Sequence, residues 1–232
     1  MCHRSEIKYC QDQGKTVLLS IGGASSNEKG FDSEFEAKKN AEMVWKMFGP
    51  KASFNTEYRP FGDTAVDGFD FETKKPVPQI DVFAGHLREL MNKADGEYFL
   101  TAAPQCPFMD KNMANLLEQV SLDAVFVQFY NHPECDVNSF ASGHKSSFNF
   151  REWDSWARST AANKKVKVLV GAPASPDATR SGYADNDKLN SVIKYSRQYS
   201  TLGGLMFWDA THLNKNEKLS RNAGNIVNGH LY

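Results

Sequence analysis

The chain has 232 residues, and its 27 lysine and arginine residues nearly balance its 28 aspartate and glutamate residues. The formal net charge of -1 does not indicate a nucleic-acid partner, because proteins of that class carry an excess of basic residues. Hydrophobic residues make up 41% of the sequence, enough to bury a core, which excludes global disorder. No apolar run reaches the roughly 18 residues of a membrane span, so we expect no membrane partner.

Short apolar runs alternate with amphipathic segments along the whole chain. The apolar runs are typical of parallel strands buried on both faces, and we predict them at residues 16–21, 66–71, 98–103, 124–129, 166–170 and 205–208. Helices are predicted at residues 5–12, 33–48, 79–92, 111–120, 150–163 and 187–199. This alternation predicts an α/β fold, and the lack of a Pro-, Gly- or Ser-rich linker predicts one domain over residues 1–232.

Six strands leave two architectures open. One is an open doubly wound sheet, in which functional groups gather at one switch point. The other is a (β/α)₈ barrel that lacks its first two strands, in which functional groups lie at the carboxyl ends of many strands.

The second predicted strand ends in a row of ionisable residues. Its alternation places Asp70, Glu72 and Lys74 on one face, where they are costly unless they pair. A structural role, such as capping a helix or binding a lysine, is one explanation for such carboxylates. Carboxylates at both 70 and 72 exceed what capping requires, so we favour a functional site.

The four cysteines, at positions 2, 10, 106 and 135, form no CxxC pair. A zinc site is therefore not expected, and the six histidines show no ligand spacing either. We expect neither a metal nor a cofactor. Spacing alone leaves open four free thiols in a cytosolic protein or two disulfides in a secreted one.

Five motifs follow one another at predicted strand ends: KTVLLSIGG at 15–23, DGFDF at 67–71, TAAPQCPF at 101–108, VQFYN at 127–131 and GGLMFWD at 203–209. In this order they resemble glycoside hydrolase family 18, and within it the class III chitinases of fungi and plants. The resemblance covers residues 5 to about 213. It implies a (β/α)₈ barrel that begins here at the helix before the third strand, so the domain is expected to be N-terminally truncated.

The resemblance also implies a cellular setting and a ligand. Cys106 and Cys135 occupy the positions of a class III disulfide, and Cys2 and Cys10 resemble a second pair. We therefore expect a secreted, fungal-type protein whose signal peptide lies outside this chain. Its expected partners are chitin or N-acetylglucosamine oligomers, bound by a monomer.

The family's catalytic signature is altered in this chain. In the family's mechanism, the substrate's own N-acetyl oxygen attacks the anomeric carbon, so the protein supplies one carboxylic acid and, two residues earlier, an aspartate that orients the acetamide. Read without gaps, Asp67 and Asp70 match, Glu72 takes the orienting position and Lys74 takes the acid position. Losing a general acid costs about 10² to 10⁴ in rate, and a cation beside an oxocarbenium-like transition state is unfavourable. We expect Lys74 to pair with Asp70 or Glu72, and hydrolysis to be lost.

The sugar-binding residues of the family are retained. By resemblance, Tyr130 contacts the acetamide, Trp208 lies under the sugar ring, and Gln128 reaches the same pocket. Packing in the barrel core is the alternative role for these side chains. The sequence thus predicts a chitinase-like pseudo-enzyme that binds chitin.

Two other functions remain open. If two residues were deleted after Phe71, Glu72 would be the acid of a weakly active endochitinase, although the gapless register places Phe83 at the family's usual distance. The third possibility is a protein-binding inhibitor of another hydrolase, with loops 50–60 and 138–149 as candidate contact segments.

Overall fold

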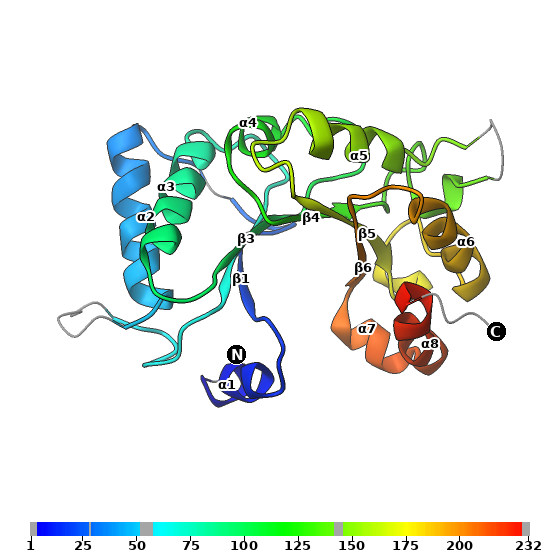
Figure 1. The fold of residues 1–232 in the computed structure, drawn as a ribbon, viewed down its shortest axis with the longest axis horizontal. Helices are drawn as coiled ribbons and strands as arrows, with labels where there is room; N and C mark the ends of the chain where they lie inside the picture. Colours follow the sequence, from blue (N-terminus) through cyan, green and yellow to red (C-terminus); the bar gives the residue numbers. More distant parts are fainter. Residues whose placement is uncertain (1–3, 28, 52–57, 142–145, 229–232) are drawn as a thin grey trace. The chain divides into compact units, whose positions relative to one another are not determined.

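A computed structural model of the chain describes residues 4–27, 29–51, 58–141 and 146–228. It contains six strands, β1 (Leu18–Gly22), β2 (Gly68–Glu72), β3 (Phe99–Ala102), β4 (Ala124–Gln128), β5 (Lys167–Pro173) and β6 (Leu202–Trp208). The α-helices are α1 (Arg4–Asp12), α2 (Glu34–Phe48), α3 (Ile80–Lys93), α4 (Ala114–Gln119), α5 (Phe150–Ser159), α6 (Asn186–Ser196), α7 (Ala210–Lys215) and α8 (Glu217–Asn228) (Figure 1). The predicted α/β alternation is confirmed.

The chain divides into two compact units. Unit 1 comprises the residues up to Ala102 together with Asn112–Asp123, and unit 2 comprises Ala103–Lys111 together with the residues from Ala124 onward. In unit 1, β1, β2 and β3 pair in parallel in chain order. In unit 2, β4, β5 and β6 do the same.

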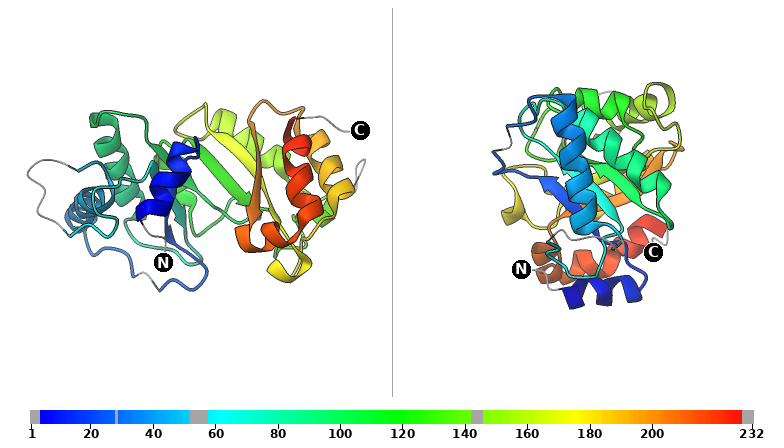
Figure 2. Two further views of the ribbon diagram at one scale, coloured as in Figure 1. Left: turned by 90° about the horizontal axis from the view of Figure 1, so that it is seen from below. Right: turned by 90° about the vertical axis from the view of Figure 1, so that its left-hand side faces the viewer.

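The core of unit 1 lies between its strands and two helices that pack side by side, α2 and α3 (Figure 2). Phe69 and Phe71 are fully buried, and Phe71 meets the ring of Phe83 edge-on at 6.0 Å. Since side chains alternate along a strand, these phenylalanines take one face of β2 and leave the other face to Asp70 and Glu72. The strand therefore combines a buried hydrophobic face with a polar one.

The core of unit 2 is rich in aromatic side chains. The ring centroids of Phe129 and Phe148 lie 4.7 Å apart, and the ring of Trp153 packs edge-on against that of Trp156. Helices α6 and α8 lie next to each other in this unit (Figure 2). Among the described helices, none has the length and apolarity needed to cross a membrane.

The ends of β6 and the chain beyond it differ from the sequence-based prediction. We expected this strand to begin at Leu205, but it begins at Leu202 and includes Gly203 and Gly204. A Cβ atom at Gly203 would lie 2.8 Å from the Cβ of Lys167, so close packing on β5 explains a glycine inside a strand. Helices α7 and α8 were not predicted, because their apolar residues are few.

Candidate functional site

The polar face of β2 carries a buried aspartate held by two hydroxyl groups. Asp70 pairs in register with Ser20 of β1 and Thr101 of β3. The Ser20 hydroxyl donates to Asp70 Oδ2 at 2.5 Å, and the Thr101 hydroxyl donates to Asp70 Oδ1 at 2.7 Å. Burial raises the pKa of Asp70, and the charge of Glu72 acts in the same direction, while both hydroxyl hydrogen bonds oppose the rise. Ser20 and Thr101 were missed in the sequence, although both lie in the strand-end motifs.

Lys74 and Glu72 form an ion pair just beyond the carboxyl end of β2. The distance between Lys74 Nζ and Glu72 Oε1 is 2.8 Å, and the side chains are 26% and 15% exposed. The predicted pairing of Lys74 is thus confirmed, with Glu72 as the partner. The Asn112 amide donates to the Lys74 carbonyl at 3.3 Å, which holds the backbone of the lysine.

Two glycines fix the backbone of Glu72. A Cβ atom at Gly22, whose φ is +103°, would lie 1.9 Å from the Glu72 carbonyl oxygen, so only glycine fits there. The Gly23 amide donates to the same oxygen at 2.8 Å. The Gly-Gly end of the first motif therefore sets the position of the Glu72–Lys74 pair.

Asp67, which we predicted to be the first residue of the catalytic signature, has a different environment from that of the Glu72–Lys74 pair. It precedes β2, and its carboxylate accepts hydrogen bonds from the Val17 amide at 2.7 Å and from the Gln11 side chain at 3.0 Å. These contacts connect α1, the start of β1 and the start of β2. The structure therefore places Asp67 at the opposite end of β2 from the Glu72–Lys74 pair.

The predicted sugar-binding residues lie in unit 2 and differ in exposure. Gln128 is buried and donates to the Ala103 carbonyl at 2.8 Å. Tyr130 is also buried, and Gly182 packs so closely on it that an added Cβ would lie 2.7 Å from the Tyr130 Cα. Trp208, the last residue of β6, is 44% exposed. Of the three, Trp208 is the one that presents a broad aromatic surface to solvent.

The segment after Trp208 is anchored by several hydrogen bonds. Asp209 caps α7 by accepting from the His212 amide at 3.1 Å, and its second oxygen lies 3.0 Å from His212 Nδ1. The hydrogen bonds to His212 lower the pKa of Asp209. The Ala174 amide donates to the Trp208 carbonyl at 2.8 Å, and the Asn216 side chain donates to the Ala174 carbonyl at 2.9 Å. These contacts fix the backbone that carries Trp208.

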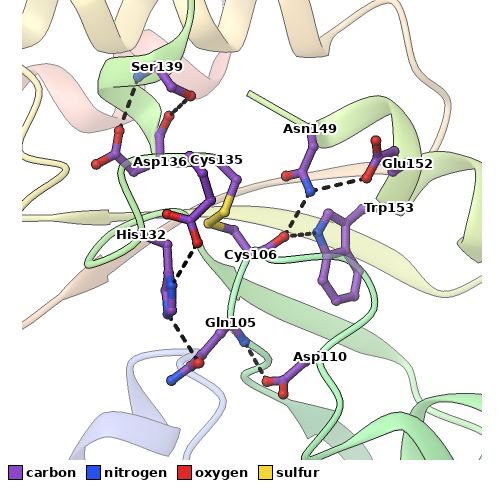
Figure 3. The surroundings of a disulfide bond; sticks show 11 residues. Gln105, Cys106, Asp110, His132, Cys135, Asp136, Ser139, Asn149, Glu152 and Trp153 are labelled. Carbon is purple, nitrogen blue, oxygen red and sulfur yellow. Dashed lines mark hydrogen bonds and ion pairs between the residues drawn. A yellow bond between two sulfur atoms is a disulfide. The ribbon is translucent and has the colours of Figure 1, made fainter. Parts of the chain in front are cut away.

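The predicted disulfide between Cys106 and Cys135 is present, and both residues are buried (Figure 3). Cys10 is exposed and forms no disulfide with a described cysteine. Its predicted partner Cys2 lies outside the described residues, as do residues 52–57 and 142–145 of the two candidate protein-binding loops. Within the described parts of the chain, no cluster of three His, Cys, Asp or Glu residues could hold a metal ion.

Comparisons with known proteins agree with the strand-end motifs. The sequence matches the family model of Glycosyl hydrolases family 18 over residues 3–181. It is 46% identical over 211 residues to a class III chitinase of Arthroderma benhamiae, an alignment that covers 89% of this chain and 64% of that protein. The chain thus spans less than two thirds of the length of this relative.

Two solved structures share the fold. A chitinase from Ipomoea carnea superimposes with a TM-score of 0.79 at 28% identity, covering 94% of this chain and 78% of that one. A xylanase and α-amylase inhibitor protein from Scadoxus multiflorus superimposes with a TM-score of 0.77 at 32% identity, covering 97% of this chain and 78% of that one. Proteins with this fold thus include both an enzyme and an enzyme inhibitor.

Proposed function

Because this chain belongs to glycosyl hydrolases family 18, we propose that it binds chitin or N-acetylglucosamine oligomers without hydrolysing them. The observation that carries this proposal is the 2.8 Å ion pair between Lys74 and Glu72 at the end of β2. In the gapless register, this pair occupies the positions of the orienting aspartate and the acid. A related protein is named as a chitinase, which supports chitin as the ligand.

The ion pair opposes the chemistry of the family in two ways. The pairing requires the ionised form of Glu72, and an ionised carboxylate has no proton to donate to a leaving group. The Lys74 ammonium also places positive charge where an oxocarbenium-like transition state needs negative charge. Asp70 is buried, and its two carboxylate oxygens accept hydrogen bonds from Ser20 and Thr101, so we do not assign it the role of the missing acid.

Binding requires less from the protein than hydrolysis does. An exposed aromatic face and a few polar groups suffice to bind a sugar ring, and Trp208 offers such a face on an anchored strand end. Trp208 is thus the residue to which we assign most of the sugar contact in unit 2.

We also propose that the protein acts outside the cell and as a monomer. The buried Cys106–Cys135 disulfide supports the extracellular setting, because structural disulfides persist in oxidising compartments.

A combined binding and turnover measurement tests the proposal. The protein is titrated with the tetramer and the hexamer of N-acetylglucosamine in a calorimeter, and the same samples are analysed by mass spectrometry. We expect heat of binding and intact oligomers. Cleavage products from the unmodified protein would overturn the assignment of a non-hydrolysing role.

Restoring the family's carboxylates tests whether the Glu72–Lys74 pair is the cause of the proposed lack of hydrolysis. The double variant Lys74→Glu with Glu72→Asp removes the ion pair and supplies both an acid and an orienting aspartate. We expect turnover to rise by about 10²-fold or more over the unmodified protein, the range that a general acid contributes. Lys75→Glu is the matched control, because Lys75 is exposed and the substitution changes the charge equally while leaving the ion pair in place.

The same samples also address the endochitinase alternative, in which Glu72 is the acid. In that case the unmodified protein cleaves the hexamer, and Glu72→Gln abolishes the cleavage while binding persists. The tight approach of Gly22 to the Glu72 backbone anchors this residue in either alternative.

A second candidate function is inhibition of another glycoside hydrolase. The observation that favours it is the 32% identity to an inhibitor of xylanase and α-amylase over 97% of this chain. To test it, the protein is added to a set of purified xylanases and α-amylases, and their rates of polysaccharide hydrolysis are measured. Inhibition together with no binding of any chitin oligomer would favour this function over sugar binding.

A further inference from the structure

Phe108 in unit 2 is an exposed aromatic residue that is nevertheless held in place. It is 42% exposed, and its ring meets the buried ring of Trp153 edge-on at 5.2 Å. Among the described residues, Tyr9 and Phe35 are more exposed than Phe108 but have no aromatic neighbour that could orient their rings. Phe108 therefore combines the exposure of a surface side chain with the fixed geometry of a core one.

Hydrogen bonds and a disulfide bond hold the loop that carries Phe108, and Figure 3 shows the residues Gln105, Cys106 and Asp110 of this loop. Its base is closed by the Gln105 amide, which donates to the buried carboxylate of Asp110 at 2.9 Å. The Cys106 carbonyl accepts hydrogen bonds from the Asn149 side chain at 2.8 Å and from Trp153 Nε1 at 3.2 Å. The disulfide then ties Cys106 to the segment after β4. Little conformational freedom remains to be lost when this loop binds a ligand.

The register of unit 2 places this loop at the same edge of the sheet as Trp208. Gln105 forms a parallel bridge with Gln128, the last residue of β4. Gln128 pairs with Gly171 of β5, and Gly171 pairs with Met206 of β6, two residues before Trp208. Three strand spacings separate Gln105 from Met206, roughly 14 Å measured across the sheet, and these two residues lie on the segments that carry Phe108 and Trp208. An oligosaccharide can span such a distance, whereas a single sugar cannot.

We propose that Phe108 is a second aromatic platform for N-acetylglucosamine oligomers, which contacts a sugar ring several units away from the one on Trp208 and so selects longer oligomers. The faces of pyranose rings carry C–H groups, and stacking one of them on a fixed aromatic ring removes apolar surface from water on both sides. A rigid, exposed phenylalanine is costly to keep in water and suits a ligand of this kind. The inference rests on the proposed binding of chitin oligomers.

The test compares oligomers of different length on a conservative variant. Phe108→Leu keeps an apolar contact with Trp153 but removes the flat ring, and Phe108→Tyr keeps the ring. Calorimetric titrations with the dimer, the tetramer and the hexamer of N-acetylglucosamine give the affinities, and thermal unfolding gives the stability. For Phe108→Leu, we expect the hexamer affinity to fall by about fivefold, the size of an aromatic stacking contribution, with the dimer affinity unchanged. Phe108→Tyr should restore the hexamer affinity.

Two further variants separate a specific role of Phe108 from a general effect on sugar binding. Phe35→Leu is the matched control, because it removes an exposed phenylalanine from unit 1 and should change no affinity. Trp208→Ala tests the proposed function itself and should weaken every oligomer. Unchanged hexamer affinity in Phe108→Leu, or an equal loss for all lengths with a lower unfolding temperature, overturns the role of Phe108 alone. If the unmodified protein binds no oligomer, the proposed function is overturned and this inference with it.

Discussion

Asp70 is a buried carboxyl group on the polar face of β2, and its pKa reflects that burial. Two hydroxyl groups hold it, yet burial dominates and raises its pKa above the ordinary value of 3.8. A carboxyl group whose folded-state pKa is raised binds its proton more tightly in the folded state than in the unfolded one. The stability that it contributes is therefore fully present below pH 3.8 and is lost as the pH rises through the raised pKa.

Replacing Asp70 by asparagine should remove this pH dependence. Asparagine is nearly isosteric with aspartate and can still form hydrogen bonds with the hydroxyl groups of Ser20 and Thr101, but it does not titrate. We expect the unfolding free energy of the unmodified protein, relative to that of Asp70→Asn, to decrease as the pH rises above 3.8. Urea unfolding at a series of pH values measures the difference.

Asp209→Asn provides a control of opposite sign. Hydrogen bonds to His212 lower the pKa of Asp209, so the stability that it contributes is present above pH 3.8 and is lost as the pH falls through the lowered pKa. If both variants change with pH in the same direction, the assignment of burial as the dominant cause at Asp70 is wrong.

At the scale of elements, Asp67 joins α1 to the first two strands of unit 1. Its carboxylate satisfies the Val17 amide and the Gln11 side chain, and the Asp67 amide donates to the Val17 carbonyl at 2.9 Å. These contacts connect Asp67, just before β2, to α1 and to the residue just before β1. Asp67 therefore acts in the assembly of unit 1, at the amino end of the strand whose carboxyl end carries the Glu72–Lys74 pair.

Asp67→Ala should destabilise unit 1 without a direct effect on the Glu72–Lys74 pair. It leaves the partly buried Val17 amide without its carboxylate acceptor, at a cost of about 1 to 3 kcal/mol. Chemical denaturation measures the loss. Asp63→Ala is the control, since it removes a surface ion pair with Lys51 that contributes little. Equal stability of the two variants would contradict the structural role of Asp67.

At the scale of the whole molecule, the residues of interest are distributed over two compact units. The Glu72–Lys74 pair belongs to unit 1, while Trp208, Phe108 and the disulfide belong to unit 2. The disulfide joins two cysteines of unit 2 with a sequence separation of 29, and it connects the loop of Phe108 to the segment that follows Tyr130. We therefore expect it to stabilise unit 2 as a whole.

Removing the disulfide should lower the stability of the protein substantially. For a loop of this length, loss of the cross-link in Cys106→Ser with Cys135→Ser costs about 3 to 4 kcal/mol in the chain-entropy description. Thermal and chemical unfolding of the double variant measure the loss. Cys10→Ser serves as the control, because Cys10 is exposed and should tolerate the change. A double variant as stable as this control would show that packing alone holds the loops of unit 2.

The α/β alternation, all six strands and the six predicted helices follow from the sequence, as does the membership of family 18. The strands are recognisable because parallel strands buried on both faces read as short apolar runs. The ends of elements are less predictable: β6 begins three residues before the predicted start because Gly203 packs closely on β5, a contact between distant segments. The sequence does not predict α7 and α8 for a different reason, because few apolar residues mark them.

The sequence by itself determined which residue types stand at the strand ends, including Lys74 just after β2 and Trp208 at the end of β6. The period of two along β2 sufficed to predict that Lys74 would find a carboxylate on its own face. Only the tertiary structure decided that the partner is Glu72, that Asp70 is held instead by Ser20 and Thr101, and that Asp67 turns to α1. It also decided that Tyr130 is buried while Trp208 and Phe108 are exposed. The physical reason is that hydrogen-bond partners and exposure depend on strand register and on loops that meet from distant parts of the chain, which no local pattern records.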